Sequence, residues 1–158
     1  MQRVTNCIFL KENQILLLQK PRRGWWAIPG GKMEPTETVK ESVIREYREE
    51  TGLHINQPQL KGIYTFLIKR DNEIISEWMM FTFLTEEGEG IQREITEEGI
   101  LKWHSVDDLS ELPMAKGDRF IIEHAVQGKD VAFGTFVYTE DFQLLSYQLD
   151  ETRKATDI

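Results

Sequence analysis

Three glutamates lie close together in one short run of the chain, at positions Glu46, Glu49 and Glu50. In a helix, which turns by about 100° per residue, they share one face within an arc of about 100°. Like charges at this spacing repel one another by roughly a few tenths of a kcal/mol per pair. A hard cation such as Mg²⁺, which prefers carboxylate and water oxygens, would relieve that repulsion. The alternative is a solvated acidic face on which Arg45 and Arg48 pair with the glutamates.

The charge of the whole chain limits what such a face can bind. The 158 residues include 19 basic and 27 acidic side chains, a formal net charge of -8. An acidic chain has no general attraction to a nucleic-acid duplex, so a phosphate-rich ligand needs local basic groups or bound cations. We therefore expect any phosphate ligand to be bound together with a metal ion.

The remaining composition indicates one globular domain. Hydrophobic residues make up 40% of the chain, which is enough to bury a single core. Cys7 is the only cysteine, which excludes an intramolecular disulfide and a cysteine-based zinc cluster. No stretch approaches the roughly 20 apolar residues of a membrane span, and the N-terminus has no secretion signal. The sequence predicts a cytoplasmic protein without a membrane partner, with one domain over residues 1–150 and a polar tail over 151–158.

The glutamates need a rigid element to hold them, and the segment Thr36–Thr51 predicts a helix. It consists mostly of good helix formers without Gly or Pro, and Gly52 follows where helices commonly end. A second helix is predicted at Asp118–Gln127, and the acidic segment 86–98 predicts a long loop. Apolar and β-branched runs predict strands at Val4–Leu10, Gln14–Gln19, Gly62–Lys69, Ile74–Leu84 and Leu101–His104, with a closing hairpin of Val131–Tyr138 and Phe142–Leu149.

The loop before the first helix contains Pro29-Gly30-Gly31-Lys32. A nucleotide-binding P-loop would need Gly where Trp26 stands and Ser or Thr where Met33 stands. The sequence therefore excludes a P-loop at this position.

The spacing of residues from Gly31 to Leu53 resembles the Nudix box, the 23-residue signature of the Nudix hydrolase superfamily. Gly31 is followed after five residues by Glu37, and Glu37 after seven by Arg45-Glu46. The remaining positions of the pattern are Tyr47, Glu49, Glu50, Gly52 and Leu53. Tyr47 departs from the family, which usually has a smaller aliphatic residue there, and this affects packing rather than chemistry.

The resemblance implies the Nudix fold, an α/β fold in which a mixed β-sheet is sandwiched between helices (α/β/α), here with a C-terminal β-hairpin. Members of this superfamily hydrolyse a nucleoside diphosphate linked to another group, using divalent cations, usually Mg²⁺ or Mn²⁺. Carried onto this chain, Glu49 and Glu50 would be metal ligands. Glu46 would join them as a ligand or as the general base, and Gly30 would contribute its backbone carbonyl. Which glutamate takes the proton is left open.

The resemblance also implies supporting roles around the glutamates. Arg45 would orient a glutamate by a charge-assisted hydrogen bond, and Glu37 would tie the loop to the helix. Gly31 and Gly52 would serve the structure of the box.

Family members often draw one more metal ligand from a loop beyond the box. In this chain Glu97 or Glu98, just before the strand at Leu101, would suit that role, and we assign it to Glu98. A solvated loop explains both side chains equally well.

Beyond Trp103 the order of elements is similar to the MutT-like branch, whose members hydrolyse oxidised purine nucleoside triphosphates. There a Trp-Pro-Asp-Asp segment reads the purine edge, and here Leu112–Asp118 occupies the corresponding place. Only Asp118 remains of the acidic pair, and Ala115 replaces the stacking tryptophan. Asp118 is thus a candidate for substrate binding, with the N-cap of the following helix as its alternative role.

Three residues ahead of the helix are further candidates for substrate binding. Arg23 and Lys32 could contact phosphates, or could be solvated surface cations. Trp26 could stack on a base, or could be a core residue.

Together these features predict a Mg²⁺-dependent pyrophosphohydrolase, in which Mn²⁺ could replace Mg²⁺. Its substrate would be a small nucleotide, a nucleoside triphosphate such as 8-oxo-dGTP, and its products a monophosphate and pyrophosphate. The alternatives are ADP-ribose, nucleotide sugars, dinucleoside polyphosphates or the 5' end of RNA as substrate, a non-catalytic nucleotide sensor with the same fold, or an acidic structural partner. The sequence leaves open a homodimer.

Overall fold

A mixed β-sheet forms the centre of the molecule in the computed structural model, which describes residues 1–151. The five long strands of the sheet are, in spatial order, β12 (Leu144–Glu151), β11 (Ala132–Thr139), β6 (Gln59–Arg70), β7 (Glu73–Thr85) and β1 (Gln2–Lys11). β1 runs parallel to β7 and β11 runs parallel to β6, whereas β6 with β7 and β11 with β12 are antiparallel pairs. The predicted closing hairpin is thus the edge of this sheet.

Shorter strands continue the sheet beyond β1 and bring the remaining loops together. They are β2 (Gln14–Gln19), β10 (Gly99–Ser105) and β9 (Ile95–Thr96), with β3 (Trp26–Ala27) paired to β2 and β4 (Gly30–Lys32) paired to β1. A separate two-stranded ladder joins β5 (Leu53–Ile55) to β8 (Gly88–Gly90).

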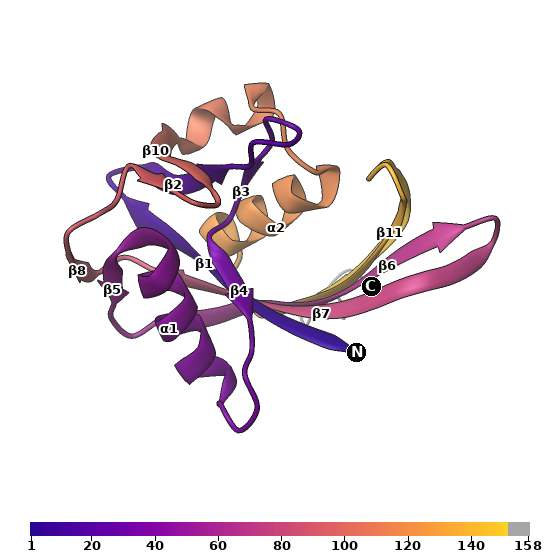
Figure 1. The fold of residues 1–158 in the computed structure, drawn as a ribbon, viewed down its shortest axis with the longest axis horizontal. Helices are drawn as coiled ribbons and strands as arrows, with labels where there is room; N and C mark the ends of the chain where they lie inside the picture. Colours follow the sequence, from indigo (N-terminus) through magenta and orange to yellow (C-terminus); the bar gives the residue numbers. More distant parts are fainter. Residues whose placement is uncertain (152–158) are drawn as a thin grey trace.

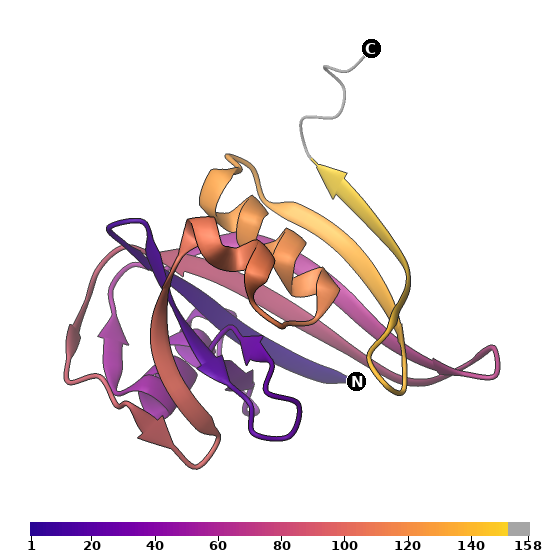
Figure 2. The same cartoon turned by 90° about the horizontal axis from the view of Figure 1, so that it is seen from above.

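Helices cover both faces of the sheet. α1 (Val39–Thr51) lies on one face and α2 (Lys116–Gln127) on the other, and a 3₁₀ segment, η1 (Val106–Glu111), precedes α2 (Figures 1 and 2). This arrangement confirms the predicted α/β class and the predicted sandwich of a mixed sheet between helices.

Each helix closes its own hydrophobic core. Under α1, the fully buried Val43 and Tyr47 pack with Cys7 and Phe9 of β1. Tyr47, the departure from the usual box residue, fills this core, and its ring lies 6.4 Å from that of Phe9 between centroids. The α2 core includes Ile8, Phe66, Phe136, Ile121 and Ile122.

α1 begins at Val39, three residues later than the predicted start at Thr36. Thr36 has a φ of 71°, in the left-handed region that a helix cannot include. Thr38 is the N-cap instead, because its hydroxyl accepts a hydrogen bond from the backbone N–H of Glu41.

Two further predictions about local structure are wrong. The segment 86–98 is not a plain loop, because β8 pairs with β5 and β9 pairs with β10. Asp118 is not a helix N-cap, because α2 begins two residues before it and Ala115 holds the cap position. The strands β8 and β9 escape prediction because their partners are brought to them only by folding. The start of α2 escapes it because the helix begins without a side-chain hydrogen bond at its cap.

Two further predictions concern the C-terminal tail and membrane spans. The predicted polar tail lies, apart from Glu151, outside the described residues. Within residues 1–151, neither α-helix has the length and apolar character that a bilayer span requires.

Candidate active site

α1 is fixed at both ends, and this determines where its glutamates point. A capping box closes the N-terminus, where Glu41 N donates to Thr38 Oγ1 at 3.0 Å and Thr38 N donates to Glu41 Oε1 at 2.9 Å. Gly52, with a φ of 85°, ends the helix and donates its N–H to the carbonyl of Arg48. Because Val43 and Tyr47 face the core, the glutamate face of the helix points toward an open cavity.

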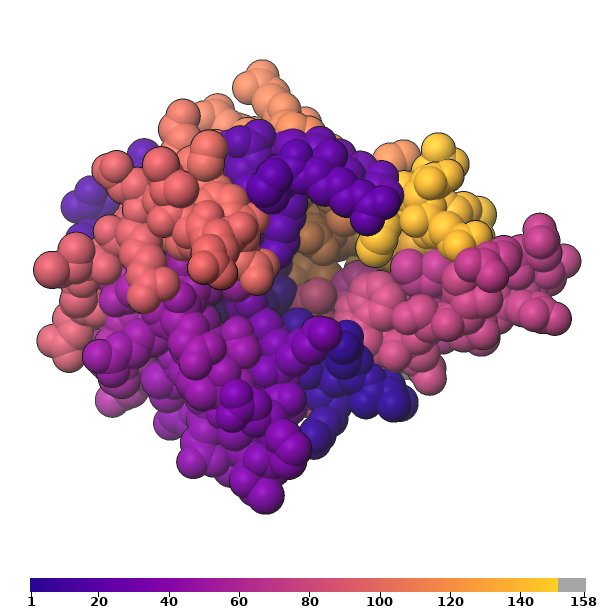
Figure 3. All heavy atoms as spheres, in the orientation of Figure 1, coloured from indigo at the N-terminus to yellow at the C-terminus, as the bar shows by residue number. Residues whose placement is uncertain are grey.

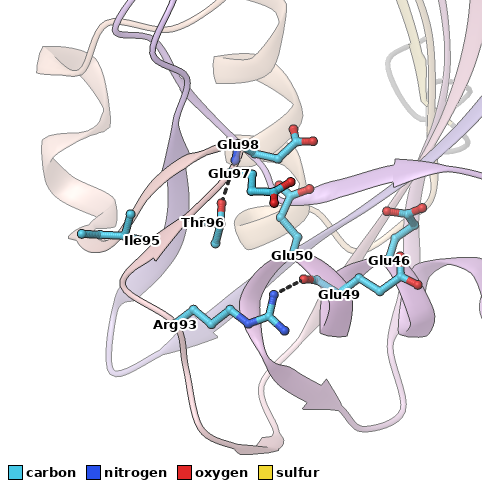
Figure 4. Close-up of a pocket in the computed structure, with 8 residues that line it drawn as sticks. All are labelled: Glu46, Glu49, Glu50, Arg93, Ile95, Thr96, Glu97 and Glu98. Carbon is cyan, nitrogen blue, oxygen red and sulfur yellow. Dashed lines mark hydrogen bonds between the residues drawn. The ribbon is translucent and has the colours of Figure 1, made fainter.

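The three box glutamates line one wall of a cavity of about 480 Å³. The opposite wall is the segment from Arg93 to Glu98, which contributes Ile95, Thr96, Glu97 and Glu98 (Figure 4). The space-filling view shows this face hollowed between that segment, α1 and the loop before α1 (Figure 3). Carboxylates that lie far apart in the sequence therefore face the same volume, which we call the carboxylate cavity.

Arg45 joins the box to the loop before α1. Its Nε donates to Glu37 Oε2 at 2.5 Å and its Nη2 to Glu37 Oε1 at 2.9 Å, a bidentate ion pair. Its Nη1 donates to Glu46 at 2.9 Å and to Glu49 at 3.1 Å, and its Nη2 also donates to the Lys32 carbonyl at 3.1 Å. Arg45 thus contacts three glutamates of the box, a geometry compatible with its predicted role of orienting one of them.

This network shifts the pKa of its acidic partner. The hydrogen bonds from Arg45, with one from the backbone of Glu34, lower the pKa of Glu37 to about 2. Hydrogen bonding to Glu37 in turn raises the pKa of Arg45 above its ordinary value. Both groups therefore stay charged near neutral pH, and the loop stays tied to the helix.

Gly31 allows the loop to approach the helix closely. A Cβ at this position would overlap the carboxylate of Glu46. The space that the missing side chain leaves is thus occupied by a box carboxylate, which explains why the pattern has Gly here.

Glu50 is a partly buried carboxylate of the box. Burial raises its pKa to about 7, with smaller opposing effects of Lys20 and of a backbone hydrogen bond from Gly30. The neighbouring charges of Glu98 and Glu46 raise the pKa further. A carboxylate with this surplus of negative neighbours is suited to bind a cation.

A second cavity of about 470 Å³ adjoins the first and shares Glu46, Glu50 and Glu98 with it. We call it the inner cavity. Its wall combines the loop before α1, strands β1 and β7, and the first turn of α2, and its other lining residues include Val4, Ile28, Lys20, Lys32, Met80 and Asp118. The inner cavity therefore joins an acidic end to a mixed polar and apolar end.

Asp118 lies in the first turn of α2 and faces the inner cavity. Burial raises the pKa of its carboxyl group to about 7. A carboxyl group in this state can donate or accept a hydrogen bond near neutral pH. This position is compatible with the predicted contact to a substrate.

Of the other residues predicted to bind substrate, one lines a cavity and two do not. Lys32 lines the inner cavity beside Gly30 and Gly31. Trp26 does not line either cavity, because its indole is buried in the α2 core and packs edge-on against His104 at 4.3 Å. Arg23 is also elsewhere, since its guanidinium lies over Phe142 and donates to the Asp141 carbonyl at 3.2 Å. The structure thus brings Lys32 to the site and does not bring Trp26 or Arg23.

Three residues of the two cavities escape prediction from the sequence. Lys20 forms an ion pair with Glu98 at 3.3 Å, and Arg93 lines the carboxylate cavity. Asn6 is buried beside the inner cavity, where its Nδ2 donates to the sulfur of Met80 and its Oδ1 has no hydrogen-bond partner within the described residues. Each is a single polar residue in or beside a strand or in a loop, and none belongs to a sequence motif that would have identified it as a site residue.

The donor set of the cavities fits a hard divalent cation in chemical type. Glu46, Glu50 and Glu98 offer carboxylate oxygens to the same volume, and their mutual repulsion contributes to the raised pKa of Glu50. In the part of the chain that the structure describes, no three acidic, histidine or cysteine side chains already enclose a single point. The carboxylates would therefore have to converge further to bind an ion.

Comparison with known proteins places these features in a family. The family model of the NUDIX domain matches residues 1–125. The Nudix hydrolase YvcI of Bacillus subtilis (strain 168) is 56% identical over 150 residues, which cover 95% of each chain. The human 8-oxo-dGDP phosphatase NUDT18 is 36% identical over 92 residues, which cover 56% of this chain and 26% of the human protein.

A solved structure agrees over the whole described fold. The crystal structure of the MutT protein from Bacillus halodurans superposes with a TM-score of 0.92 at 53% identity, and the match covers 95% of this chain and 98% of that one. The chain therefore belongs to the Nudix hydrolase family and is a MutT-like member of it.

Proposed function

We propose that this Nudix hydrolase cleaves a nucleoside triphosphate to a nucleoside monophosphate and pyrophosphate, with an oxidised purine nucleotide such as 8-oxo-dGTP as substrate. One observation carries the proposal. The carboxylate cavity and the inner cavity share Glu46, Glu50 and Glu98, so a ligand can occupy both at once. A nucleotide would suit the two joined cavities, because it has an anionic phosphate chain at one end and a flat base with polar edges at the other.

At the acidic end, the residues that would hold Mg²⁺ or Mn²⁺ are Glu46, Glu49, Glu50 and Glu98, with the backbone of Gly30. A bound divalent cation supplies charge neutralisation of the phosphates and activation of the attacking water. A water would attack the α- or the β-phosphorus and give up its proton to one of the box glutamates. The P–O bond that bridges these two phosphorus atoms would break, and the products would be the nucleoside monophosphate and pyrophosphate. Arg45 keeps Glu46 and Glu49 oriented during this reaction through its two hydrogen bonds.

At the other end, the inner cavity supplies groups for the rest of the nucleotide. Lys20 and Lys32 place positive charge beside the carboxylates, where the phosphates would lie. Asp118 offers a carboxyl group with a pKa of about 7 to a base edge, and Met80 and Ile28 offer apolar contacts to its faces. These contacts support a purine nucleotide over an isolated pyrophosphate.

Relatives support the oxidised base as a hypothesis. NUDT18 is named as an 8-oxo-dGDP phosphatase, so a diphosphate is a second candidate substrate. The match covers 26% of the human protein, so its activity is only a guide to that of this chain.

The test is a hydrolysis screen with Mg²⁺ in which the products are identified. The panel contains 8-oxo-dGTP, 8-oxo-dGDP, dGTP, ADP-ribose, a dinucleoside polyphosphate and an RNA with a 5' triphosphate, and Glu46→Gln is the inactive reference. We expect the highest kcat/KM with 8-oxo-dGTP and the release of pyrophosphate. A preference for ADP-ribose or for the dinucleotide would overturn the proposed substrate and leave the family assignment intact.

A second measurement separates an enzyme from a sensor. Mg²⁺ and nucleotide together should raise the thermal stability of the intact chain, because a ligand that binds only the folded state stabilises it. A chain that is stabilised but shows no more turnover than Glu46→Gln across the panel would be a nucleotide sensor. A chain with no stabilisation and no turnover would contradict both functions.

A further inference from the structure

The wall of the carboxylate cavity opposite α1 is attached to the end of that helix. β8 pairs with β5 through Gly90 opposite Leu53, directly after α1 ends. Gly52 makes this close approach possible, because a Cβ at its position would overlap the carbonyl oxygen of Ile91. The segment that follows, from Arg93 to Glu98, therefore begins at a fixed point beside the last turn of α1.

Arg93 makes two hydrogen bonds at this attachment point. Its backbone N–H donates to the carbonyl of Thr51 at 2.8 Å. Its Nη1 donates to the carbonyl of Glu49 at 2.6 Å, the bond that Figure 4 draws between these two residues. Carbonyls in the last turn of a helix have no partner within the helix and carry its partial negative charge. A cationic donor is well suited to satisfy them.

The guanidinium of Arg93 is directed to this backbone even though it lines a cavity of carboxylates. Among residues 1–151, no carboxylate lies within ion-pairing distance of Arg93. By contrast, Arg45 on the other side of the box is surrounded by them. Arg93 thus forms no ion pair with the carboxylates of the cavity, and it joins the two segments that carry them.

The cavity carboxylates follow Arg93 after a short stretch of chain. Glu97 and Glu98 come four and five residues later, and the Glu98 N–H donates to Thr96 Oγ1 at 3.1 Å. The side chain of Glu98 has one further attachment, the ion pair with Lys20, in which both side chains are substantially exposed at 44% and 60%. An exposed pair of this kind contributes little to stability, about 0–1 kcal/mol. Arg93 therefore holds the start of the segment that carries these carboxylates, and the pairing of β9 with β10 holds its end.

We propose that Arg93 is a positioning residue that holds the segment carrying Glu97 and Glu98 against the end of α1, so that both walls of the cavity act on one divalent cation. This inference rests on the proposed function for the cation. The attachment itself is independent of it.

The experiment measures Mn²⁺ affinity directly, by isothermal titration or by electron paramagnetic resonance, without turnover. Arg93→Gln should weaken Mn²⁺ binding by about 10-fold, in the range found for residues that orient metal ligands. Arg93→Lys should retain most of the affinity, since an ammonium group can still donate to the Glu49 carbonyl. Arg70→Gln is the matched control. Arg70, at the end of β6, pairs with Glu140 in the turn between β11 and β12, and neither residue lines the carboxylate cavity or the inner cavity, so this variant should leave the affinity unchanged.

A double-mutant cycle tests whether Arg93 acts through the two carboxylates. In a chain that already carries Glu97→Gln and Glu98→Gln, adding Arg93→Gln should cause no further loss of Mn²⁺ affinity. An equal loss in both backgrounds would overturn the proposal, because Arg93 would then act on the cation by another route.

Hydrogen exchange separates this inference from the proposed function. Arg93→Gln should accelerate amide exchange in residues 90–98, and Arg70→Gln should not. Unchanged exchange in that segment would overturn the positioning role even if Mn²⁺ affinity fell. An intact chain that binds no Mn²⁺ would contradict the metal-dependent function, while faster exchange in Arg93→Gln would still support the attachment.

Discussion

The two walls of the carboxylate cavity are held in place in different ways. The α1 wall is held by side chains that are close in sequence, with Arg45 bonded to Glu37, Glu46 and Glu49 and with a capping box at the helix start. The facing wall, residues 93–98, is held at one end by two hydrogen bonds from Arg93 to the end of α1 and at the other end by the pairing of β9 with β10. Glu98 adds one exposed ion pair with Lys20. The side chain of Glu46 is 18% exposed and bonded to Arg45, whereas that of Glu98 is 60% exposed. We therefore expect the α1 wall to be prearranged and the side chains of the facing wall to be the adjustable part of the site.

The largest expected effect is a difference in kcat between variants of the two walls. Glu46→Gln should lower kcat by about 10²- to 10⁴-fold, because a positioned group that acts on protons or holds the cation is lost from the fixed wall. Glu97→Gln, on the adjustable wall and lining only one of the two cavities, should lower kcat much less. The check is steady-state kinetics with Mg²⁺ and 8-oxo-dGTP.

Glu94→Gln is the control for that comparison, since Glu94 is exposed and lines neither cavity. Equal losses for Glu46→Gln and Glu97→Gln would show that the two walls do not differ in the way proposed.

The next effect concerns the point where the walls meet. Gly52→Ala should lower the free energy of unfolding by more than the roughly 1–2 kcal/mol that a left-handed backbone costs a residue with a Cβ, because the new methyl group also overlaps the Ile91 carbonyl. Gly24→Ala is the matched control, since Gly24 has a φ of +69° but its Cβ position would make only an ordinary contact, at 3.8 Å from Gln19 Nε2. Urea denaturation measures both, and an equal loss in the two variants would argue against a close contact between α1 and residue 91.

A smaller effect is expected at the start of α1. Thr38→Ala removes the hydroxyl that accepts from Glu41 N, and should cost about 1 kcal/mol of stability. Thr38→Ser keeps the hydroxyl and should cost much less. Thermal denaturation provides the measurement, and an alanine variant as stable as the serine variant would mean that the cap does not fix this wall.

The smallest effect is a pH dependence of the α1 wall. The folded-state pKa of Glu37 is about 2, below the roughly 4.3 of an unfolded glutamate. The ionised carboxylate therefore stabilises the fold above the unfolded pKa, and this stabilisation is lost as pH falls toward 2. We expect wild type to melt above Glu37→Gln near neutral pH and the two melting temperatures to converge in acid; a difference that persists unchanged at pH 2 would rule out the Arg45 pair as its cause.

Much of the fold follows from local patterns. The long strands, the closing hairpin and both helices were predictable because apolar periodicity and helix-ending glycines act over a few residues. The start of α1 was not, because the N-terminal boundary depends on which residue supplies the cap, and Thr38 does so while Thr36 adopts a positive φ. The short strands β8 and β9 were also missed, since their partners β5 and β10 become neighbours only in the folded chain.

The residues of the candidate site likewise fall into those that local spacing predicts and those that it does not. The box glutamates, Arg45 and Glu37 could be chosen from spacing, because they act within one helix and the loop before it. Trp26 lies in the α2 core and lines neither cavity, and residue type alone does not tell a core tryptophan from one that stacks on a ligand. Lys20, Asn6 and Arg93 could not be chosen, because each reaches the cavities through strand pairing or loop docking.

By itself, the sequence determined the family, the acidic helix face and the charge balance that requires cations beside phosphates, since these depend on residue identity and on the 3.6-residue turn of a helix. Only the tertiary structure decided which side chains share a cavity with that face. The physical reason is distance along the chain: the carboxylate of Glu98 faces the box only because β10 pairs with β2 and Arg93 docks on the end of α1.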